Sequence, residues 1–142
     1  MLRVGIVGCG LIGNKRARVI KDDPEACLCS VADLDVLRAG GLLKEYGDGK
    51  GAAYKDWKEM LDKEKMDAVV VATPNKYLRE ITLAALQRRI HVLCEKPLGR
   101  NLQESEEIIK ARGSWLMAES SKLKAEGPGN DFSSLLLTPY LF

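Results

Sequence analysis

The sequence predicts a doubly wound, Rossmann-like α/β fold, in which helices cover both faces of a parallel sheet. Over the first 112 residues, short apolar segments rich in β-branched residues alternate with helix-compatible segments. The first apolar segment leads into Gly8, Gly10 and Gly13, which have the spacing G-x-G-x-x-G. The second apolar segment ends at Asp33, 20 positions after Gly13. These features together are typical of a dinucleotide-binding domain.

The glycine loop joins a predicted strand, residues 4–7, to a predicted helix, residues 11–21. Gly8 permits a tight turn, Gly10 presents no side chain to a pyrophosphate, and Gly13 lets the helix approach the strand closely. The unpaired N–H groups at the start of the helix would face the anion. We therefore predict pyrophosphate binding by these glycines together with Leu11 and Ile12, which complete the loop.

Asp33 has two interpretations. The first helix ends at Asp22-Asp23-Pro24, and residues 25–32 form a second strand that leads into Asp33. The carboxylate either contacts the adenine-side ribose hydroxyls or caps a helix over residues 34–46. The glycine loop upstream favours ribose contact. Since a carboxylate repels a 2′-phosphate, NAD is the predicted cofactor, with NADP as the alternative because Arg38 is near in sequence.

The remaining segments continue the alternation. After a loop at residues 47–51, we predict strands at 52–54, 68–72 and 90–94, and helices at 55–63, from about 76 to 88, and at 102–112, with Asn101 as the cap of the last. The residues that follow two of these strands are Thr73-Pro74-Asn75 and Glu95-Lys96-Pro97. Because parallel strands place their C-terminal ends on one edge, these loops should meet the glycine loop there, at the ligand-binding edge.

Composition narrows the class of protein. Of 142 residues, 46% are hydrophobic and 30% charged, with a net charge of +2, so nucleic acid and anionic membranes are not expected partners. No apolar run is long enough for a membrane helix, and the first residues do not resemble a signal peptide. The cysteines, at positions 9, 27, 29 and 94, lack metal-ligand spacing. We expect free thiols, no metal and a cytoplasmic protein.

The alternation of strands and helices fades at residue 113. We therefore divide the chain into a dinucleotide-binding domain, residues 1–112, and a divergent tail, residues 113–142. The end of the tail, LLLTPYLF, is apolar and is expected to cover exposed surface or to promote association with a second copy.

Four stretches resemble the Gfo/Idh/MocA family of NAD(P)-dependent oxidoreductases. They read VGIVGCGLIG, VADLD, DAVVVATPN and HVLCEKPLG, and the resemblance covers about residues 1–112, the family's N-terminal nucleotide-binding domain. It implies hydride transfer between nicotinamide and a sugar, inositol or related hydroxyl or carbonyl substrate. By this resemblance Thr73, Pro74 and Asn75 lie under the cofactor, and Glu95 helps to hold the nicotinamide ribose. Lys96 lies beside the nicotinamide and substrate as a catalytic residue that polarises the reacting oxygen.

Two departures limit this expectation. Family members often have H-x-H after the T-P-N motif, where this chain has Lys76-Tyr77-Leu78. The family's C-terminal α/β domain, which supplies substrate contacts and a histidine proton acceptor, has no counterpart here. The one histidine, His91, resembles a family position with a structural role. We expect little activity from this chain alone; the alternative is a non-catalytic dinucleotide-binding or interaction module from a truncated chain.

Overall fold

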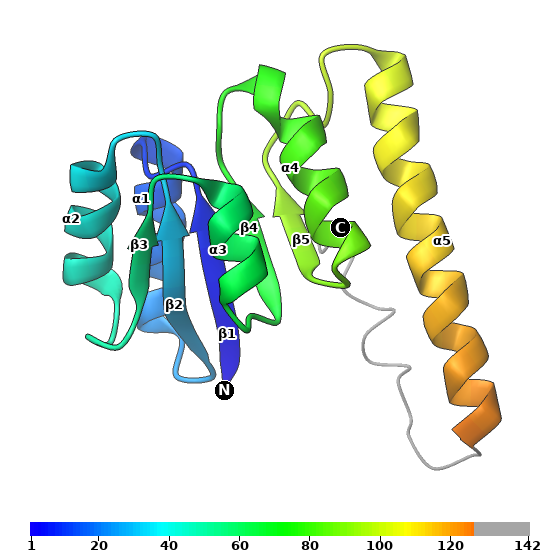
Figure 1. Cartoon of the computed structure of the whole chain (residues 1–142), viewed down its shortest axis with the longest axis horizontal. Helices are drawn as coiled ribbons and strands as arrows, with labels where there is room; N and C mark the ends of the chain where they lie inside the picture. The colour runs from blue at the N-terminus through cyan, green and yellow to red at the C-terminus, as the bar shows by residue number, and fades with distance from the viewer. Residues whose placement is uncertain (127–142) are drawn as a thin grey trace.

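The computed structural model describes residues 1–126, with side chains to Trp115. The predictions for the apolar end, residues 135–142, lie outside the described residues. The described chain forms one five-stranded sheet in which every pairing is parallel (Figure 1). Its strands are β1 (Leu2–Val7), β2 (Ala26–Ala32), β3 (Ala52–Tyr54), β4 (Ala68–Val71) and β5 (His91–Cys94).

The strand order is β3-β2-β1-β4-β5, which confirms the predicted doubly wound topology. From β1 the chain proceeds outward to β3, then returns to pair β4 with the other side of β1. This reversal between β1 and β4 is the topological switch point, at which open α/β sheets leave a crevice for ligands. The glycine loop after β1 and the Thr73 loop after β4 both begin at this point.

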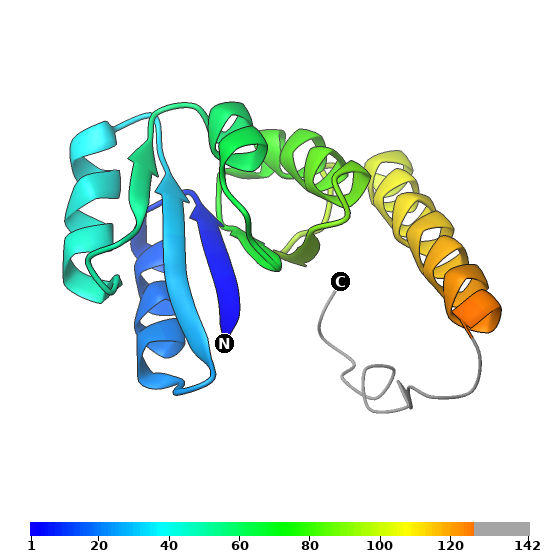
Figure 2. The same ribbon diagram turned by 60° about the horizontal axis from the view of Figure 1, so that its bottom comes forward.

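Helices cover both faces of the sheet. In Figure 1 α1 lies behind the sheet and α3 in front of it, and Figure 2 shows α3 and α4 following one another along the same face. The described helices are α1 (Leu11–Asp22), α2 (Val36–Tyr46), α3 (Trp57–Lys63), α4 (Asn75–Gln87) and α5 (Leu102–Glu126). Within the described residues, no helix is both long and apolar enough to cross a membrane.

Strand β4 shows how the core is divided. All four of its residues are buried, and consecutive valines point to opposite faces. Val70 belongs to the hydrophobic cluster beneath α1 and α2, whereas Val69 and Val71 belong to the cluster beneath α3 and α4. A strand buried on both faces needs no polar alternation, which explains the uninterrupted valine run.

Side chains cap the starts of α2, α3 and α5. Asp35 caps α2 by accepting the N–H groups of Leu37 and Arg38, at 3.1 and 3.2 Å. Asp56 likewise caps α3. Both helices therefore begin two residues later than predicted from the sequence. Asn101 accepts the N–H of Glu104 at 2.9 Å, which confirms its predicted role at the start of α5.

Helix α5 differs from its predicted end at residue 112, because it continues to Glu126. Gly113 lies in its middle with no neighbouring atom within 4 Å of a Cβ position. A glycine costs a helix only about 1 kcal/mol, which does not end it. The helix packs beside α4, where Ile108 is buried and Glu107 pairs with Arg79. The division of the chain at residues 112 and 113 stays a prediction.

Candidate functional site

The glycine loop is a tight turn in which two positions, Gly8 and Gly13, leave no room for a side chain. Gly8 has φ +95°, and a Cβ there would lie 2.6 Å from the carbonyl oxygen of Ala72. A Cβ on Gly13 would lie 2.0 Å from the carbonyl oxygen of Gly8. These distances are too short for any side chain. The backbone of the loop therefore packs directly against the backbone of helix α1 and of the residues that follow β4. The tight turn and the close helix packing predicted for Gly8 and Gly13 are both present.

The N-terminus of α1 is open. Among the described residues no side chain caps it, and its first helical hydrogen bond runs from Asn14 N–H to Gly10 O, at 2.9 Å. The N–H groups before Asn14 thus precede the helical ladder. At Gly10, no heavy atom lies within 4 Å of a Cβ position. Leu11 and Ile12 expose their side chains, so this end of the helix can receive an anion on its backbone.

Asp33 lies between the glycine loop and α2. Its Oδ2 accepts the N–H of Cys9 at 2.8 Å, and its Oδ1 accepts the N–H of Asp35 at 2.9 Å. The guanidinium of Arg38 approaches Oδ1 at 3.9 Å. Asp35, not Asp33, caps α2, so the interpretation of Asp33 as a simple helix cap is wrong. A carboxylate offers about four lone-pair sites, and two backbone bonds leave capacity for a ligand hydroxyl.

A cavity of ≈ 430 Å³ opens at the C-terminal ends of β1, β2 and β4. Its walls are mostly apolar, which is typical of ligand pockets of this size. Of the residues predicted from the sequence, Gly8, Asp33, Thr73 and Pro74 line it. The Thr73 hydroxyl is buried and has no hydrogen-bond partner within the described part of the chain.

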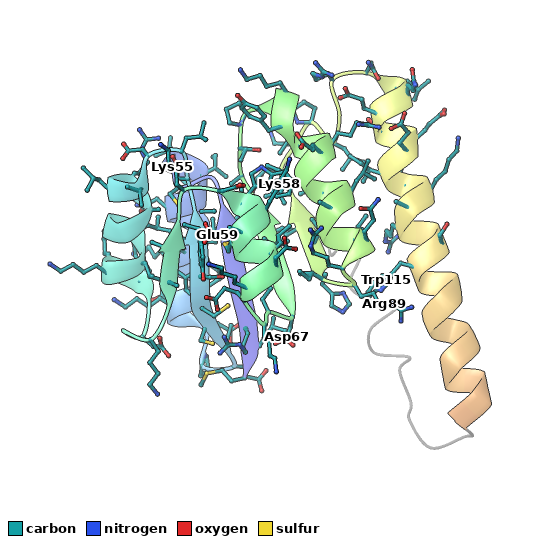
Figure 3. The ribbon with its side chains drawn as sticks, in the orientation of Figure 1. Lys55, Lys58, Glu59, Asp67, Arg89 and Trp115 are labelled. Atoms are coloured by element: carbon teal, nitrogen blue, oxygen red, sulfur yellow. The ribbon has the colours of Figure 1, made fainter. Side chains whose placement is uncertain are left out.

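Lys55, Trp57 and Tyr77 also line this cavity, and none of them was predicted as a site residue from the sequence. Trp57 is the first residue of α3 and packs against the hydrophobic cluster beneath α3 and α4. Lys55 directly follows β3. Because residues that follow parallel strands lie at the ligand-binding edge, this position could have identified Lys55 from the sequence. Figure 3 shows Lys55 at the end of the sheet toward which the strand arrows point.

The loop after β5 lies one strand further along the same edge. Glu95 donates its N–H to Val71 O at 3.0 Å, and its carboxylate is paired with Arg16 of α1. Lys96 is exposed and forms no ion pair within the described residues. Neither Glu95 nor Lys96 lines the cavity, and Asn75, the first residue of α4, also lies outside its lining. Arg16 was not predicted, because a cation in the second turn of a helix carries no distinguishing sequence signal.

The thiol of Cys9 is buried beneath the glycine loop. Burial, together with the nearby Asp33 carboxylate, raises the pKa of Cys9 to about 12, and Arg38 opposes this in part. All four cysteines are free. No three metal-ligating side chains cluster in the part of the chain that the structure describes. Cys9 is therefore a structural thiol rather than a nucleophile.

His91 lies far from this edge. It is the first residue of β5, at the opposite end of the strand from Glu95, and its N–H donates to Asp67 O at 3.0 Å. Its ring meets Trp115 edge-on, with centroids 4.7 Å apart. Figure 3 places Asp67 and Trp115 toward the end of the sheet away from Lys55. The histidine thus packs between the sheet and α5, as its predicted structural role requires.

The parallel sheet, the open helix after a glycine loop, and the acidic residue after β2 define the class of dinucleotide-binding Rossmann domains. The sequence profile of the Gfo/Idh/MocA oxidoreductases, described as an oxidoreductase family with an NAD-binding Rossmann fold, matches residues 2–114. The chain belongs to this family and comprises its NAD-binding domain.

Individual relatives support the assignment. The chain is 32% identical over 109 residues to myo-inositol 2-dehydrogenase of Thermotoga maritima, covering 77% of this chain and 32% of that protein. It is 37% identical over 111 residues to inositol 2-dehydrogenase 4 of Saccharopolyspora erythraea, covering 78% and 32%. The crystal structure of myo-inositol 2-dehydrogenase from Lactobacillus plantarum superposes with a TM-score of 0.73 at 31% identity, covering 80% and 33%. The chain thus spans about a third of these relatives' length.

Proposed function

We propose that this chain is the cofactor-binding part of an NAD-dependent dehydrogenase that oxidises an inositol or a related sugar. The observation that carries the proposal is the meeting, at the β1–β4 switch point, of the open α1 N-terminus, Asp33 and the cavity. Two relatives that are 32% and 37% identical to this chain over the matched residues are inositol dehydrogenases. The chain covers about a third of the length of these relatives, so the activity of a whole dehydrogenase is part of the proposal.

The adenosine and pyrophosphate half of NAD fits the residues of this edge. The free space at Gly10 and the exposed start of α1 support pyrophosphate binding on the backbone N–H groups of Leu11, Ile12 and Gly13. Remaining lone pairs on Asp33 support binding of the ribose hydroxyls. The mostly apolar cavity next to Asp33 supports binding of the adenine base.

The β4 and β5 loops supply the rest of the proposed site. Thr73, Pro74 and Asn75, in the loop after β4, are proposed to lie under the cofactor. The buried Thr73 hydroxyl, which has no partner among the described residues, would offer the cofactor a hydrogen bond. Glu95 is proposed to accept a nicotinamide ribose hydroxyl. Lys96 is proposed as the catalytic residue: its ammonium, which forms no ion pair among the described residues, would stabilise negative charge on the substrate oxygen. A bound NAD would supply the hydride acceptor.

The proposed cofactor preference is for NAD, since the Asp33 carboxylate repels a 2′-phosphate. Arg38 and Lys55 on the cavity wall favour the alternative, NADP. Arg38, however, already lies 3.9 Å from Asp33 and 3.6 Å from Asp35, so it is shared between two carboxylates. A phosphate would have to compete with both for the guanidinium.

Fluorescence titration with NADH and NADPH tests this proposal. We expect saturable NADH binding and NADPH binding at least about tenfold weaker, a difference of about 1.4 kcal/mol. Absence of saturable binding at millimolar NADH would contradict the proposed function. Tighter binding of NADPH would instead overturn only the role of Asp33.

A second candidate function is a dinucleotide-binding module without catalysis. It is favoured by the position of His91, because alcohol oxidation needs a proton acceptor and this histidine lies at the wrong end of β5. Screening inositols and sugars for NAD reduction separates the two candidates. We expect no turnover from this chain alone, and turnover that Lys96→Ala abolishes would show that the described residues suffice.

A further inference from the structure

Helix α1 and the loop after β5 are joined by one ion pair. Arg16, in the second turn of α1, donates from Nε to Oε1 of Glu95 at 2.6 Å. A second guanidinium nitrogen, Nη2, lies 2.5 Å from the same oxygen. The two residues are 79 positions apart, and the sheet order places β4 between β1, which leads into α1, and β5. The pair therefore connects the glycine-loop helix to the β5 loop across the switch point.

The pairing uses only one side of the carboxylate. Both guanidinium nitrogens approach Oε1, and Oε2 accepts no hydrogen bond from any described residue. The backbone of Glu95 is fixed separately, since its N–H donates to Val71 O in β4. The side chain is thus held in one place from α1 and the backbone from β4, with one carboxylate oxygen still available as an acceptor.

The ion pair between Arg16 and Glu95 is expected to contribute little to the stability of the fold. Arg16 is 44% exposed, and exposed ion pairs contribute little to the stability of a fold. Glu95 is only 17% exposed, so it loses part of its hydration and gains a charged partner in exchange. The planar guanidinium fixes the direction of such a contact better than a flexible ammonium does.

We infer that Arg16 is a positioning residue for the nicotinamide end of the cofactor site. It holds Glu95 by Oε1 and so leaves Oε2 to accept a hydrogen bond from a ribose hydroxyl. The inference rests on the proposed NAD-binding function, and it extends that function to a residue outside the glycine, T-P-N and E-K-P motifs.

Calorimetric titration of the whole chain with NADH and with ADP tests this role, because ADP lacks the nicotinamide ribose. We expect Arg16→Ala to weaken NADH binding about five- to tenfold and ADP binding less than about twofold. Arg16→Lys should recover part of the NADH affinity, since it restores the charge without the fork. Arg18→Ala, an exposed arginine of the same helix with no contact to Glu95, is the matched control and should leave both affinities unchanged.

A double-mutant cycle makes the test specific to the pair. If Arg16 acts through Glu95, Arg16→Ala combined with Glu95→Ala should bind NADH no more weakly than Glu95→Ala alone. Arg16→Gln, which keeps the aliphatic stem, replaces Arg16→Ala in the cycle if thermal melting shows that the alanine variant is unfolded.

Three results would overturn the inference. Equal losses of NADH and ADP affinity in Arg16→Ala would place the residue at the pyrophosphate or in the fold. Additive losses in the double variant would show that Arg16 and Glu95 act independently. Unchanged NADH binding in Arg16→Ala would leave the proposed function standing without a role for Arg16, whereas wild-type protein that fails to bind NADH would refute both.

Discussion

The carboxylate of Asp33 and the backbone of Cys9 are joined by a hydrogen bond of 2.8 Å. Through its other oxygen, Asp33 also holds the N–H of Asp35, the residue that caps α2. One side chain thus ties the glycine loop to the start of the second helix. A residue proposed to bind ribose is also part of the local structure, and its substitution has two separable effects.

Replacing Asp33 with asparagine tests both effects. Asparagine keeps one carbonyl oxygen as acceptor, so one of the two backbone N–H groups loses its bond, and we expect stability to fall by about 1 kcal/mol. The loss of negative charge should also reduce the preference for NADH over NADPH. Urea unfolding measures the first effect, and paired titrations measure the second.

Asp35→Asn is the matched control for Asp33→Asn. Asparagine caps a helix about as well as aspartate, so we expect stability within about 0.5 kcal/mol of the wild type. Its NADH-to-NADPH preference should change less than that of Asp33→Asn, because Asp35 accepts no N–H group of the glycine loop and loses only its charge toward Arg38, 3.6 Å away. If Asp33→Asn kept the wild-type preference, the ribose role of Asp33 would be wrong even though its structural role stood.

Two of the loop glycines, Gly10 and Gly13, should respond differently to alanine. A Cβ at Gly13 would lie 2.0 Å from Gly8 O, so we expect Gly13→Ala to cost about 3 kcal/mol or more, or to prevent folding. Gly10→Ala meets no atom of the chain within 4 Å and should cost at most about 1 kcal/mol. Chemical denaturation followed by circular dichroism compares the two variants.

Gly10→Ala then isolates the binding role of the loop. Because the free space beside Gly10 is where the pyrophosphate is proposed to lie, we expect NADH affinity to fall at least about tenfold in a folded protein. Gly40→Ala, in α2, also has free space at its Cβ position and serves as the control. Normal NADH binding by Gly10→Ala would move the pyrophosphate away from this residue.

The fold could be predicted from the sequence because its signals are local. The valine run of β4 indicates a strand buried on both faces, and the glycine spacing indicates the turn into α1. The ends of helices were harder to predict, because two neighbouring aspartates, Asp33 and Asp35, are both good caps. Only the folded structure shows that the Asp33 carboxylate accepts the Cys9 N–H, whereas Asp35 caps α2.

Long-range contacts of the site could not be predicted in this way. Arg16 and Glu95 are 79 positions apart, and nothing in the spacing of charged residues along a helix identifies such a partner. No motif includes Trp57, and Tyr77 was noted only as a departure from the H-x-H pattern, whereas the fold brings both residues to the same cavity. The motifs thus predicted the glycine and aspartate side of the site, whereas the helical contributions required the structure.

The Cys9 thiol should resist alkylation in the folded protein. Burial and the Asp33 carboxylate raise its pKa to about 12, so at pH 8 the reactive thiolate is almost absent. We expect iodoacetamide to modify Cys9 at least about tenfold more slowly than Cys27, which is half-buried at the start of β2. Peptide mass spectrometry measures both sites, and labelling in urea should equalise them. Rapid native modification of Cys9 would show that the loop opens readily.

The pKa of Cys9 also predicts a limit at alkaline pH. The folded pKa lies above the ordinary value of 9.0, so the unfolded chain releases its proton first as the pH rises. The contribution of the protonated Cys9 thiol to the free energy of unfolding is complete below pH 9 and is lost progressively as the pH rises toward 12. Cys9→Ala should therefore lose less stability than the wild type between pH 9 and 11, as measured by urea unfolding at each pH.

Glu104 should make the stability of the α5 start depend on acidic pH. Its carboxylate accepts the backbone N–H and the Nε of Arg100, at 2.8 and 2.9 Å, and this pairing holds its pKa below the ordinary value of 4.5. Because the folded pKa is the lower one, the contribution is complete above pH 4.5 and is lost as the pH falls through the folded pKa. Glu104→Gln should be less stable than the wild type at pH 7. The difference should narrow as the pH falls through the folded pKa of Glu104, because the protonated side chain is neutral like glutamine.

Thermal melting from pH 3 to pH 7 measures this convergence, with Glu106→Gln as the control. Glu106 lies on the same helix, and its one ion pair among the described residues is with Lys110, at 3.8 Å. Because both of these side chains are exposed, removing the Glu106 charge should shift the melting curve little at any pH. A stability difference between wild type and Glu104→Gln that does not narrow as the pH falls below 4.5 would mean that the hydrogen bonds of Glu104 matter without its charge. Convergence would show instead that the ion pair with Arg100 anchors α5 where the loop after β5 ends, next to the proposed nicotinamide end of the site.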